Sequence, residues 1–327
     1  MNAELLKKLF RAIGQTPSSE LEKLCAVVIE DERKKGHETL ARQLSRILES
    51  SRPSGDAEQL RSLSPLTKSK RSGELLVSFK PPEILRHHMV LAPEVEGRFQ
   101  RVEKEYAARD RLNRHGFVHR RRVLLYGAPG CGKSLGAERL AWNTGLPFYR
   151  VRFDTLISSL FGESASNLRR VFEMAAERPC LLFLDECDFI ARSRRATNDV
   201  GEIPRIVNTL LQLMEDYEGS GLIVAATNLT EALDEALFRR FDEVLEVPLP
   251  GQAEILKLLQ QTIAPLGSPK LKLNDVAQRL EGQSAATIVK VAQDACKSVI
   301  LQGSNTVSST ELIAAIEEQY QTVASAE

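Results

Sequence analysis

Residues 127–134 form a glycine-rich octapeptide. It matches the pattern G-x-x-x-x-G-K-S/T, in which glycines let backbone N–H groups surround phosphate oxygens. An apolar run at residues 123–126 precedes it, and a helical pattern follows it. This strand–loop–helix order is the context in which the pattern binds phosphate, so the segment predicts a nucleotide site within an α/β domain.

Two side chains of this loop have specific expected roles. Lys133 would place its ammonium charge on the β- and γ-phosphate oxygens, and the hydroxyl of Ser134 would bind Mg²⁺. The helix that follows would direct its positive end at the same anion. The predicted cofactor-binding residues are Gly127, Ala128, Pro129, Gly130, Cys131, Gly132, Lys133, Ser134, Leu135 and Asp185.

A second motif is an apolar run, residues 181–184, that ends in the two acids Asp185 and Glu186. At the carboxyl edge of a parallel strand, Asp185 can hold Mg²⁺ through its water shell beside Ser134. Glu186 can polarise the water that attacks the γ-phosphate. The next acid, Asp188, is assigned a structural role.

Asn228 follows another apolar run and is a further polar residue at a predicted strand end. Beside a Mg²⁺ site, its amide can orient the attacking water. The alternative is the ordinary role of asparagine as a turn former after a strand. We favour the catalytic role because the neighbouring strand already ends in Asp185 and Glu186.

Short apolar runs alternate with helical patterns between residues 75 and 250. Runs that are apolar throughout and are separated by helices indicate a parallel sheet buried on both faces. Right-handed crossovers then give a doubly wound α/β domain over residues 75–250. The predicted strands are residues 123–126, 148–153, 181–184, 222–226 and 244–247. Beyond them only helical patterns remain, chiefly at 253–264 and 285–301, so residues 251–327 are predicted to form a small helical domain.

The N-terminal part of the chain lacks the alternation of apolar runs and helical patterns. Residues 1–49 carry three short helical patterns with a break at Gly36, and they predict a small helical unit. Such a unit is either a docking module or packing for the next domain. Residues 50–74 are rich in Ser, Pro, Lys and Arg without sustained periodicity, which is typical of a flexible linker.

The bulk composition argues against several classes of protein. Lysine plus arginine and aspartate plus glutamate both number 44, and this balance disfavours nucleic acid as the main partner. The five cysteines show no metal-ligand spacing, so reduced thiols are expected. No run approaches the roughly 18 apolar residues of a membrane span, and the first residues lack an apolar signal core. We therefore expect a soluble, cytoplasmic protein.

Taken in order, the loop at 127–134, the acids at 185–186, Asn228 and the segment 233–242 resemble the AAA family of ATPases in its narrower sense. The last segment reads Leu-Asp-Glu-Ala-Leu-Phe-Arg-Arg-Phe-Asp and is similar to the family's second region of homology. The resemblance covers residues 91–300 and is to small stand-alone bacterial members. It implies ATP and Mg²⁺ as cofactors, a strand order of 5-1-4-3-2, a C-terminal helical lid and assembly into a hexameric ring.

In this family the second region of homology carries arginine fingers that reach the nucleotide of the neighbouring subunit. The resemblance therefore implies a catalytic role in trans for Arg239 and Arg240. Many members have two fingers separated by two residues, whereas these arginines are adjacent. Arg240 aligns best with the Arg-Phe-Asp end of the motif, and which of the two is the principal finger stays open. Arg205, before a predicted helix at 206–215, resembles an interface residue that touches the neighbour's nucleotide.

Residues 159–164 resemble the first pore loop, with which AAA remodellers grip an extended polypeptide. The family places an aromatic residue before an aliphatic one, whereas here Leu160 precedes Phe161. The alternative is that both side chains cover the end of a helix. Near the adenine and ribose, family members often carry a Gly-Ala pair, and this chain has small residues at 284–287 instead.

The resemblance leaves two main functions open. The first is a hexameric motor that remodels or pulls on a protein recognised by the N-terminal helices. The second is a regulatory partner whose nucleotide state controls docking onto another protein, such as a protease, in defence or quality control. Nucleic-acid loading or unwinding is disfavoured by the zero net charge, and the basic run at 119–122 is expected to face acids or a neighbouring subunit. A small-molecule kinase is disfavoured because the acids, the asparagine and the arginine pair fit ATP hydrolysis better.

Overall fold

The computed structural model describes residues 75–158, 163–188, 202–228, 238–266, 271 and 273–324. These residues all belong to the second of two compact units of the chain, Thr67–Glu327. The helical unit predicted at 1–49, the linker predicted at 50–74, and the loop with Leu160 and Phe161 lie outside the described residues, as do residues 233–237.

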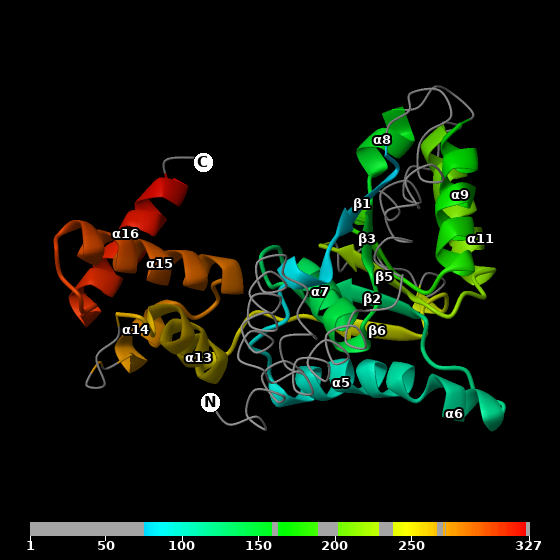
Figure 1. The fold of residues 1–327 in the computed structure, drawn as a ribbon. Coiled ribbons are helices and arrows are strands. Elements are labelled where there is room, and N and C mark those ends of the chain that lie inside the picture. The colour runs from blue at the N-terminus through cyan, green and yellow to red at the C-terminus, as the bar shows by residue number, and fades with distance from the viewer. Residues whose placement is uncertain are drawn as a thin grey trace, which may run out of the picture. The chain divides into compact units, whose positions relative to one another are not determined.

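A six-stranded sheet forms the centre of the α/β region (Figure 1). Its strands are β1 (Val77–Lys80), β2 (Arg122–Tyr126), β3 (Phe148–Val151), β4 (Leu181–Leu184), β5 (Leu222–Thr227) and β6 (Glu243–Glu246). Their order across the sheet is β1-β3-β4-β5-β2-β6, with β1 antiparallel to β3 and the other pairs parallel. Counted along the chain from β2, the five parallel strands therefore lie in the order 5-1-4-3-2.

The predicted α/β fold with a parallel sheet is confirmed, and the five predicted strands agree with the observed ones to within two residues at each end. β4 and β5 are buried at every position, as expected for runs that are apolar throughout. The strand predicted at 148–153 ends at Val151, because Phe153 begins helix α8 (Phe153–Ser158). β1 is absent from the predicted strands because it is a short edge strand with an exposed Phe79 and lacks the continuous apolar run of a central strand.

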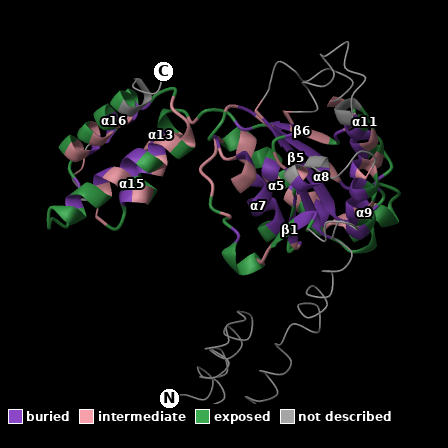
Figure 2. Cartoon of the chain, turned by 90° about the horizontal axis from the view of Figure 1, so that it is seen from above, coloured by how far each residue is buried: buried purple, intermediate pink, exposed green. Residues whose placement is uncertain are grey.

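Helices cover both faces of this sheet (Figure 1). On one face, α5 (Pro93–Ala107) and α7 (Lys133–Thr144) share a core with alternate residues of the strands, such as Leu125. On the other face, α9 (Ser164–Glu177) packs against α11 (Glu202–Glu215). Figure 2 shows that the sheet and the inner faces of these helices are buried. The remaining short helices of the described α/β region are η1 (Pro82–Ile84) and α6 (Arg109–Arg114).

A helical domain follows β6. Its described helices are α13 (Gln252–Ile263), α14 (Asn274–Arg279), α15 (Ala285–Leu301) and α16 (Ser309–Ala324). They surround a core of their own, in which Leu259, Ala292 and Leu312 are fully buried. α15 begins where the sequence predicts, because the hydroxyl of Ser284 accepts a hydrogen bond from the backbone N–H of Thr287 and caps the helix.

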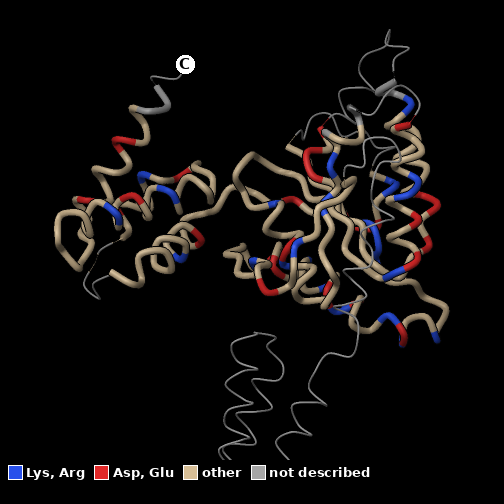
Figure 3. Tube along the Cα trace, turned by 45° about the horizontal axis from the view of Figure 1, so that its top comes forward, with Lys and Arg blue, Asp and Glu red and all other residues tan. Residues whose placement is uncertain are grey.

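Basic and acidic residues are interspersed along the described chain (Figure 3). Several of them pair between elements, as Arg139 of α7 does with Glu96 and Glu103 of α5. In the part of the chain that the structure describes, opposite charges therefore pair locally rather than gather in one basic and one acidic region. Among the described residues, no helix is both long enough and apolar enough to cross a lipid bilayer.

Candidate active site

The glycine-rich loop connects the carboxyl end of β2 to the first residue of α7. Gly127, Gly130 and Gly132 have φ angles of 142°, 76° and 99°, which residues with a side chain rarely adopt. A Cβ atom on Gly127 would lie 2.3 Å from the Val247 carbonyl oxygen, and one on Gly130 would lie 2.6 Å from Ser284 Oγ. Backbone conformation therefore requires glycine at all three positions, and close packing requires it also at Gly127 and Gly130.

Lys133 is the first residue of α7 and is almost fully buried, with 8% of its surface exposed. Its Nζ donates hydrogen bonds to the carbonyl oxygens of Gly127 and Ala128, both at 2.9 Å. Burial lowers the pKa of Lys133, and the nearby Cys131 and Asp188 raise it in part. A buried ammonium group whose hydrogen bonds go to neutral carbonyls gains most from an anion, so the loop fits a phosphate group.

The acidic end of β4 lies directly beside this loop. Ser134 Oγ donates a hydrogen bond to Asp185 Oδ2 at 3.2 Å, which joins the two predicted Mg²⁺ ligands. Arg150, on the neighbouring strand β3, forms an ion pair with the same oxygen at 2.9 Å. A hydroxyl and a carboxylate supply the oxygen ligands that Mg²⁺ prefers, so these two residues fit that ion.

Glu186 adopts a backbone conformation that is rare for its residue type. Its φ is 55°, in the left-handed region, and it is the one non-glycine residue with positive φ among those the structure describes. Its backbone N–H donates a hydrogen bond to Asp185 Oδ1 at 3.0 Å, which supports the turn. A left-handed residue other than glycine costs about 1 kcal/mol, and such strain concentrates at functional sites.

Asp188 joins the ends of β4 and β5, in agreement with its predicted structural role. Its Oδ1 accepts hydrogen bonds from Thr227 Oγ1 at 2.6 Å and from the Asn228 backbone N–H at 2.8 Å. Its Oδ2 accepts a longer one from Asn228 Nδ2 at 3.4 Å. Asp188 therefore orients the Asn228 amide, and Asn228 lines the same cavity as Asp185 and Glu186.

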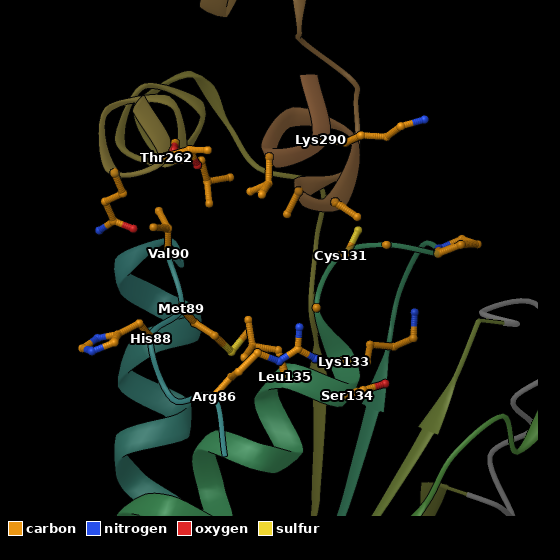
Figure 4. A pocket seen from close by; sticks show the side chains of 18 of the residues that line it. Arg86, His88, Met89, Val90, Cys131, Lys133, Ser134, Leu135, Thr262 and Lys290 are labelled. Carbon is orange, nitrogen blue, oxygen red and sulfur yellow. Dashed lines mark hydrogen bonds between the residues drawn. The ribbon is translucent and has the colours of Figure 1, made fainter. Parts of the chain in front are cut away.

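A cavity of about 750 Å³ brings most of the predicted residues together (Figure 4). Its volume is typical of a site for a small molecule. The predicted residues that line it are Pro129, Gly130, Cys131, Gly132, Lys133, Ser134, Leu135, Asp185, Glu186 and Asn228. Gly127 and Ala128 do not line the cavity, but their carbonyl groups hold the Lys133 ammonium.

The remaining walls come from three segments whose residues are mostly not among the predicted site residues. One is the segment between η1 and α5, and two are helices of the helical domain (Figure 4). Their lining residues are Arg86, His88, Met89 and Val90; Leu258, Gln261 and Thr262 of α13; and Ala285, Ala286, Val289, Lys290 and Gln293 of α15. Only the start of α15 carries a sequence signal, its small residues, and the contact there is direct because the Ala286 N–H donates to the Gly130 carbonyl oxygen at 3.0 Å.

A buried carboxylate on α7 fixes the wall segment that precedes α5. Glu138 is 5% exposed, and its Oε2 accepts a hydrogen bond from the Arg86 backbone N–H at 2.9 Å. The same oxygen pairs with Lys80 Nζ at 2.8 Å. The neighbouring His87 stacks on Trp142, with ring centroids 4.4 Å apart. These contacts tie the wall to the helix that also carries the lysine of the phosphate loop.

Arg239 and Arg240 do not line the cavity of their own chain. Arg239 is exposed, and Arg240 Nε pairs with Glu215 Oε1 at 2.6 Å at the end of α11. Arg205, also on α11, is exposed and outside the cavity. These three predicted residues therefore lie elsewhere on the chain than the phosphate loop.

The cysteines that the structure describes, Cys131, Cys180, Cys187 and Cys296, are free thiols. Burial raises the pKa of Cys131 in the phosphate loop, and it raises the pKa of Cys180 to about 12. A thiol that stays protonated is a weak nucleophile. Burial of Cys131, which is 4% exposed, and its raised pKa both disfavour the thiolate form.

Comparison with known proteins assigns the family. The family model described as "ATPase family associated with various cellular activities (AAA)" matches residues 123–249. A relative from Sinorhizobium fredii, described as the uncharacterized AAA family ATPase y4kL, is 36% identical over 319 residues, which cover 97% of this chain and 94% of the relative. The chain therefore belongs to the AAA family of ATPases. Its activity is the hydrolysis of ATP.

Two further relatives match a smaller part of the chain. A proteasome-activating nucleotidase from Thermococcus onnurineus is 32% identical over 264 residues, which are 75% of this chain and 66% of that protein. A katanin-like p60 ATPase from Oryctolagus cuniculus is 36% identical over 213 residues, 61% of this chain and 43% of that protein. The chain thus spans less than half of the katanin-like protein and about two thirds of the nucleotidase. The predicted family and ATPase activity are confirmed.

Proposed function

We propose that this chain works as a ring of six copies and uses ATP hydrolysis to remodel or pull on a protein target. The observation that carries the proposal is the division of the predicted catalytic residues. The loop, the acids and the asparagine line one cavity, whereas Arg239 and Arg240 lie outside it, with Arg240 held against Glu215. An arginine that serves a γ-phosphate from this position has to come from a neighbouring copy.

Within one cavity the residues have separate roles. Lys133 neutralises charge on the β- and γ-phosphates, and Ser134 and Asp185 would hold Mg²⁺, the carboxylate acting through water. The ion, when bound, supplies positive charge to the phosphate oxygens. Glu186 takes a proton from the attacking water, and Asn228 orients that water.

The parts of the chain have separate tasks in this proposal. Residues 75–250 hydrolyse ATP, residues 251–327 cover the nucleotide, and residues 1–49, joined by the linker 50–74, recognise the target in the cytoplasm. The match to the Sinorhizobium fredii relative supports a task for the N-terminal part, because it covers 97% of the chain and so extends well before residue 75. The name of the proteasome-activating relative supports a protein as the target.

The mass of the Glu186→Gln chain in Mg²⁺-ATP tests the ring. This variant should bind ATP but hydrolyse it at least about 100-fold more slowly, because water activation is lost while the Mg²⁺ ligands remain. Light scattering across a concentration series should then give a six-subunit mass that falls when nucleotide is removed. A monomer at every concentration contradicts the ring.

Mixing two inactive variants tests whether the arginine acts in trans. Arg240→Ala subunits keep an intact cavity, and Lys133→Ala subunits keep an intact arginine pair. A mixture should recover part of the hydrolysis only if the arginine of one subunit completes the site of the next. Repeating the mixture with Arg239→Ala identifies the principal finger. If neither the Arg240→Ala mixture nor the Arg239→Ala mixture recovers hydrolysis, neither arginine acts on the nucleotide of a neighbouring subunit.

A second candidate function is nucleotide-dependent regulation of a companion protein, such as a protease, without threading. The proteasome-activating relative favours it, since that match covers 75% of this chain. Coexpression with the product of the neighbouring gene, followed by sizing chromatography, distinguishes the two functions. A complex that forms only with ATP favours regulation, whereas ATP-dependent unfolding of a tagged protein by this chain alone favours the motor.

A further inference from the structure

A second cavity lies at the opposite edge of the sheet from the phosphate loop. The phosphate loop follows the carboxyl end of β2, whereas the basic run at residues 119–122 leads into the amino end of the same strand. The cavity has a volume of about 340 Å³ and is lined by this run together with Glu215, Tyr217 and Asp242. The proposed ATPase mechanism makes no use of it.

Two of the three arginines in the run face acids, as the sequence analysis expects. Arg122 pairs with Asp242 at 2.7 Å, and the backbone N–H groups at positions 121 and 122 donate to the same carboxylate. Arg120 pairs with Glu243 at 2.9 Å and also with Glu105. These carboxylates therefore already have arginine partners.

Arg121 and His119 line the cavity with side-chain nitrogen atoms that have no hydrogen-bond partner. Among the described residues, Arg121 forms no ion pair, and its buried Nε has no hydrogen-bond partner. His119 is 3% exposed, and neither ring nitrogen has a partner, although the ring packs edge-on against Tyr106. Glu215, the other acid of the cavity wall, is paired with Arg240. Buried polar groups without partners are costly, so the cavity is chemically incomplete.

The charges around His119 also bear on what the cavity can bind. Burial lowers the pKa of His119, the positive charges of Arg121 and Arg109 lower it further, and the negative charges of Glu105 and Asp242 raise it in part. Positive charges that disfavour protonation of a buried imidazole are balanced by a negative group placed between them. Because Asp242 and Glu215 already have arginine partners and Arg121 Nε has none, the cavity suits an anion rather than a cation.

We propose that this cavity binds one oxyanion, a carboxylate or a phosphate group, between the Arg121 guanidinium and the His119 imidazole. The fork of N–H donors on a guanidinium matches either group, and the imidazole adds one further donor. The cavity has less than half the volume of the nucleotide cavity, at about 340 Å³ against about 750 Å³. It therefore suits a small anion or an acidic side chain rather than a second nucleotide.

The oxyanion is either free in solution or carried by an acidic side chain of a second copy of this chain. Glu215 lines the cavity and also binds Arg240, the arginine assigned to the neighbour's nucleotide. The cavity thus borders the surface that faces the next copy in the proposed ring. Only this second source rests on the proposed function.

Titration calorimetry with inorganic phosphate tests the cavity in the full chain. A Glu186→Gln background saturated with Mg²⁺-ATP keeps the phosphate loop filled, so added phosphate cannot bind there. We expect one phosphate per chain, with affinity lowered about tenfold or more by Arg121→Gln and partly restored by Arg121→Lys. His119→Leu should weaken binding less, because it removes only a neutral donor. The matched control Arg111→Gln, which changes an exposed arginine of α6, should have no effect.

Light scattering of the same variants separates the two sources. If a second copy fills the cavity, Arg121→Gln and added phosphate each lower the mass of the ATP-bound assembly. If the anion is free, phosphate binds while the mass is unchanged. The proposal is overturned if neither the mass nor the phosphate affinity depends on Arg121. A chain that stays monomeric in ATP contradicts the proposed ring. The phosphate titration would still test whether the cavity binds an oxyanion.

Discussion

Among single residues, Asp185 makes several of the polar contacts that hold the site together. Its Oδ1 accepts the Glu186 N–H at 3.0 Å, and its Oδ2 receives both the Ser134 hydroxyl at 3.2 Å and Arg150 at 2.9 Å. The Arg150 guanidinium therefore pairs with the same carboxylate oxygen as Ser134, the other residue that would hold Mg²⁺. The Arg150 side chain is 51% exposed, so solvent screens this ion pair and the pair can open.

Replacing Arg150 with glutamine should strengthen the effect of Mg²⁺ on nucleotide binding. The substitution removes the charge that competes for Asp185 Oδ2, while the Ser134 hydroxyl remains. An exposed ion pair contributes about 0.2–1 kcal/mol, so the Mg²⁺ concentration for half-maximal ADP affinity should fall about two- to fivefold in a fluorescent-ADP titration. Arg111→Gln is the matched control. A higher Mg²⁺ requirement would mean instead that Arg150 orients the carboxylate for the ion.

Lys133→Ala should weaken ADP binding about 100-fold, because the phosphates lose two or more charge-assisted hydrogen bonds. The same fluorescent titration measures the loss. Lys257→Ala, which changes an exposed lysine of α13 outside the cavity, should leave the affinity unchanged. Equal affinities for the Lys133→Ala variant and the unaltered chain would remove the lysine from phosphate binding.

Site residues could be predicted from the sequence where their neighbours in the structure are also their neighbours along the chain. Lys133 and Ser134 stand at fixed positions in a loop between a strand and a helix, so their neighbourhood follows from chain order. Arg150 reaches Asp185 only through the pairing of β3 with β4, and Glu138 reaches Arg86 only through the packing of α7. Contacts of this kind depend on tertiary structure, and no local pattern encodes them.

At the scale of helices, two glycines should respond in opposite ways to alanine. A Cβ on Gly136 of α7 would lie 2.9 Å from Cζ of the fully buried Phe99, so Gly136→Ala should lower the free energy of unfolding by about 1–3 kcal/mol. A Cβ on Gly97 of α5 would have no atom within 4 Å, so Gly97→Ala should raise it by about 0.5–1 kcal/mol. Urea unfolding measures both. A gain in both variants would show that α5 and α7 are loosely packed.

Glu138 makes the link between α7 and the cavity wall sensitive to acid. Burial raises the pKa of Glu138, but hydrogen bonds from Lys80 and Arg86 lower it more, and the net pKa lies below its ordinary value of 4.5. A carboxylate whose pKa is lower in the folded chain stabilises the fold above its unfolded pKa. That stabilisation is lost as the pH falls through the folded-state pKa.

Urea unfolding from about pH 6 to about pH 3 should therefore show a loss of stability on the acid side, to which Glu138 contributes. Glu138→Gln should lower stability at the upper end of this range by about 1.5–3 kcal/mol, because hydrogen bonds to a charged acceptor are weakened. It should also make the dependence on pH shallower. Glu281→Gln, which changes an exposed carboxylate, is the matched control. The idea fails if the Glu138→Gln variant keeps the original slope.

Elements with a continuous apolar pattern could be predicted, and elements defined by their partners could not. β4 and β5 are buried along their whole length, and the bounds of α15 agree with its apolar stripe. β1 is held by antiparallel pairing with β3, and its exposed edge removes the apolar signal. α13 follows its predicted span closely, but its place in the cavity wall depends on how the helical domain meets the phosphate loop.

At the scale of the whole described unit, the nucleotide cavity joins two hydrophobic cores. The phosphate loop belongs to the core of the α/β domain, and α13 and α15 belong to the core of the helical domain. The Ala286 N–H and the Gly130 carbonyl oxygen connect the two domains by a hydrogen bond of 3.0 Å. A ligand that fills the cavity between them should therefore stabilise their closed arrangement.

Saturating ADP should accordingly slow hydrogen exchange in both walls of the cavity. At a hundredfold excess of ADP over its Kd, the bound state is stabilised by about 2.7 kcal/mol. Exchange mass spectrometry should show slower exchange in peptides containing Lys133 and in peptides containing Ala286, whereas peptides from α16, which does not line the cavity, should change little. The Lys133→Ala variant should lose both effects at the same ADP concentration. Protection confined to the phosphate loop would mean that the helical domain does not close over the nucleotide, and its role as a lid would then be wrong.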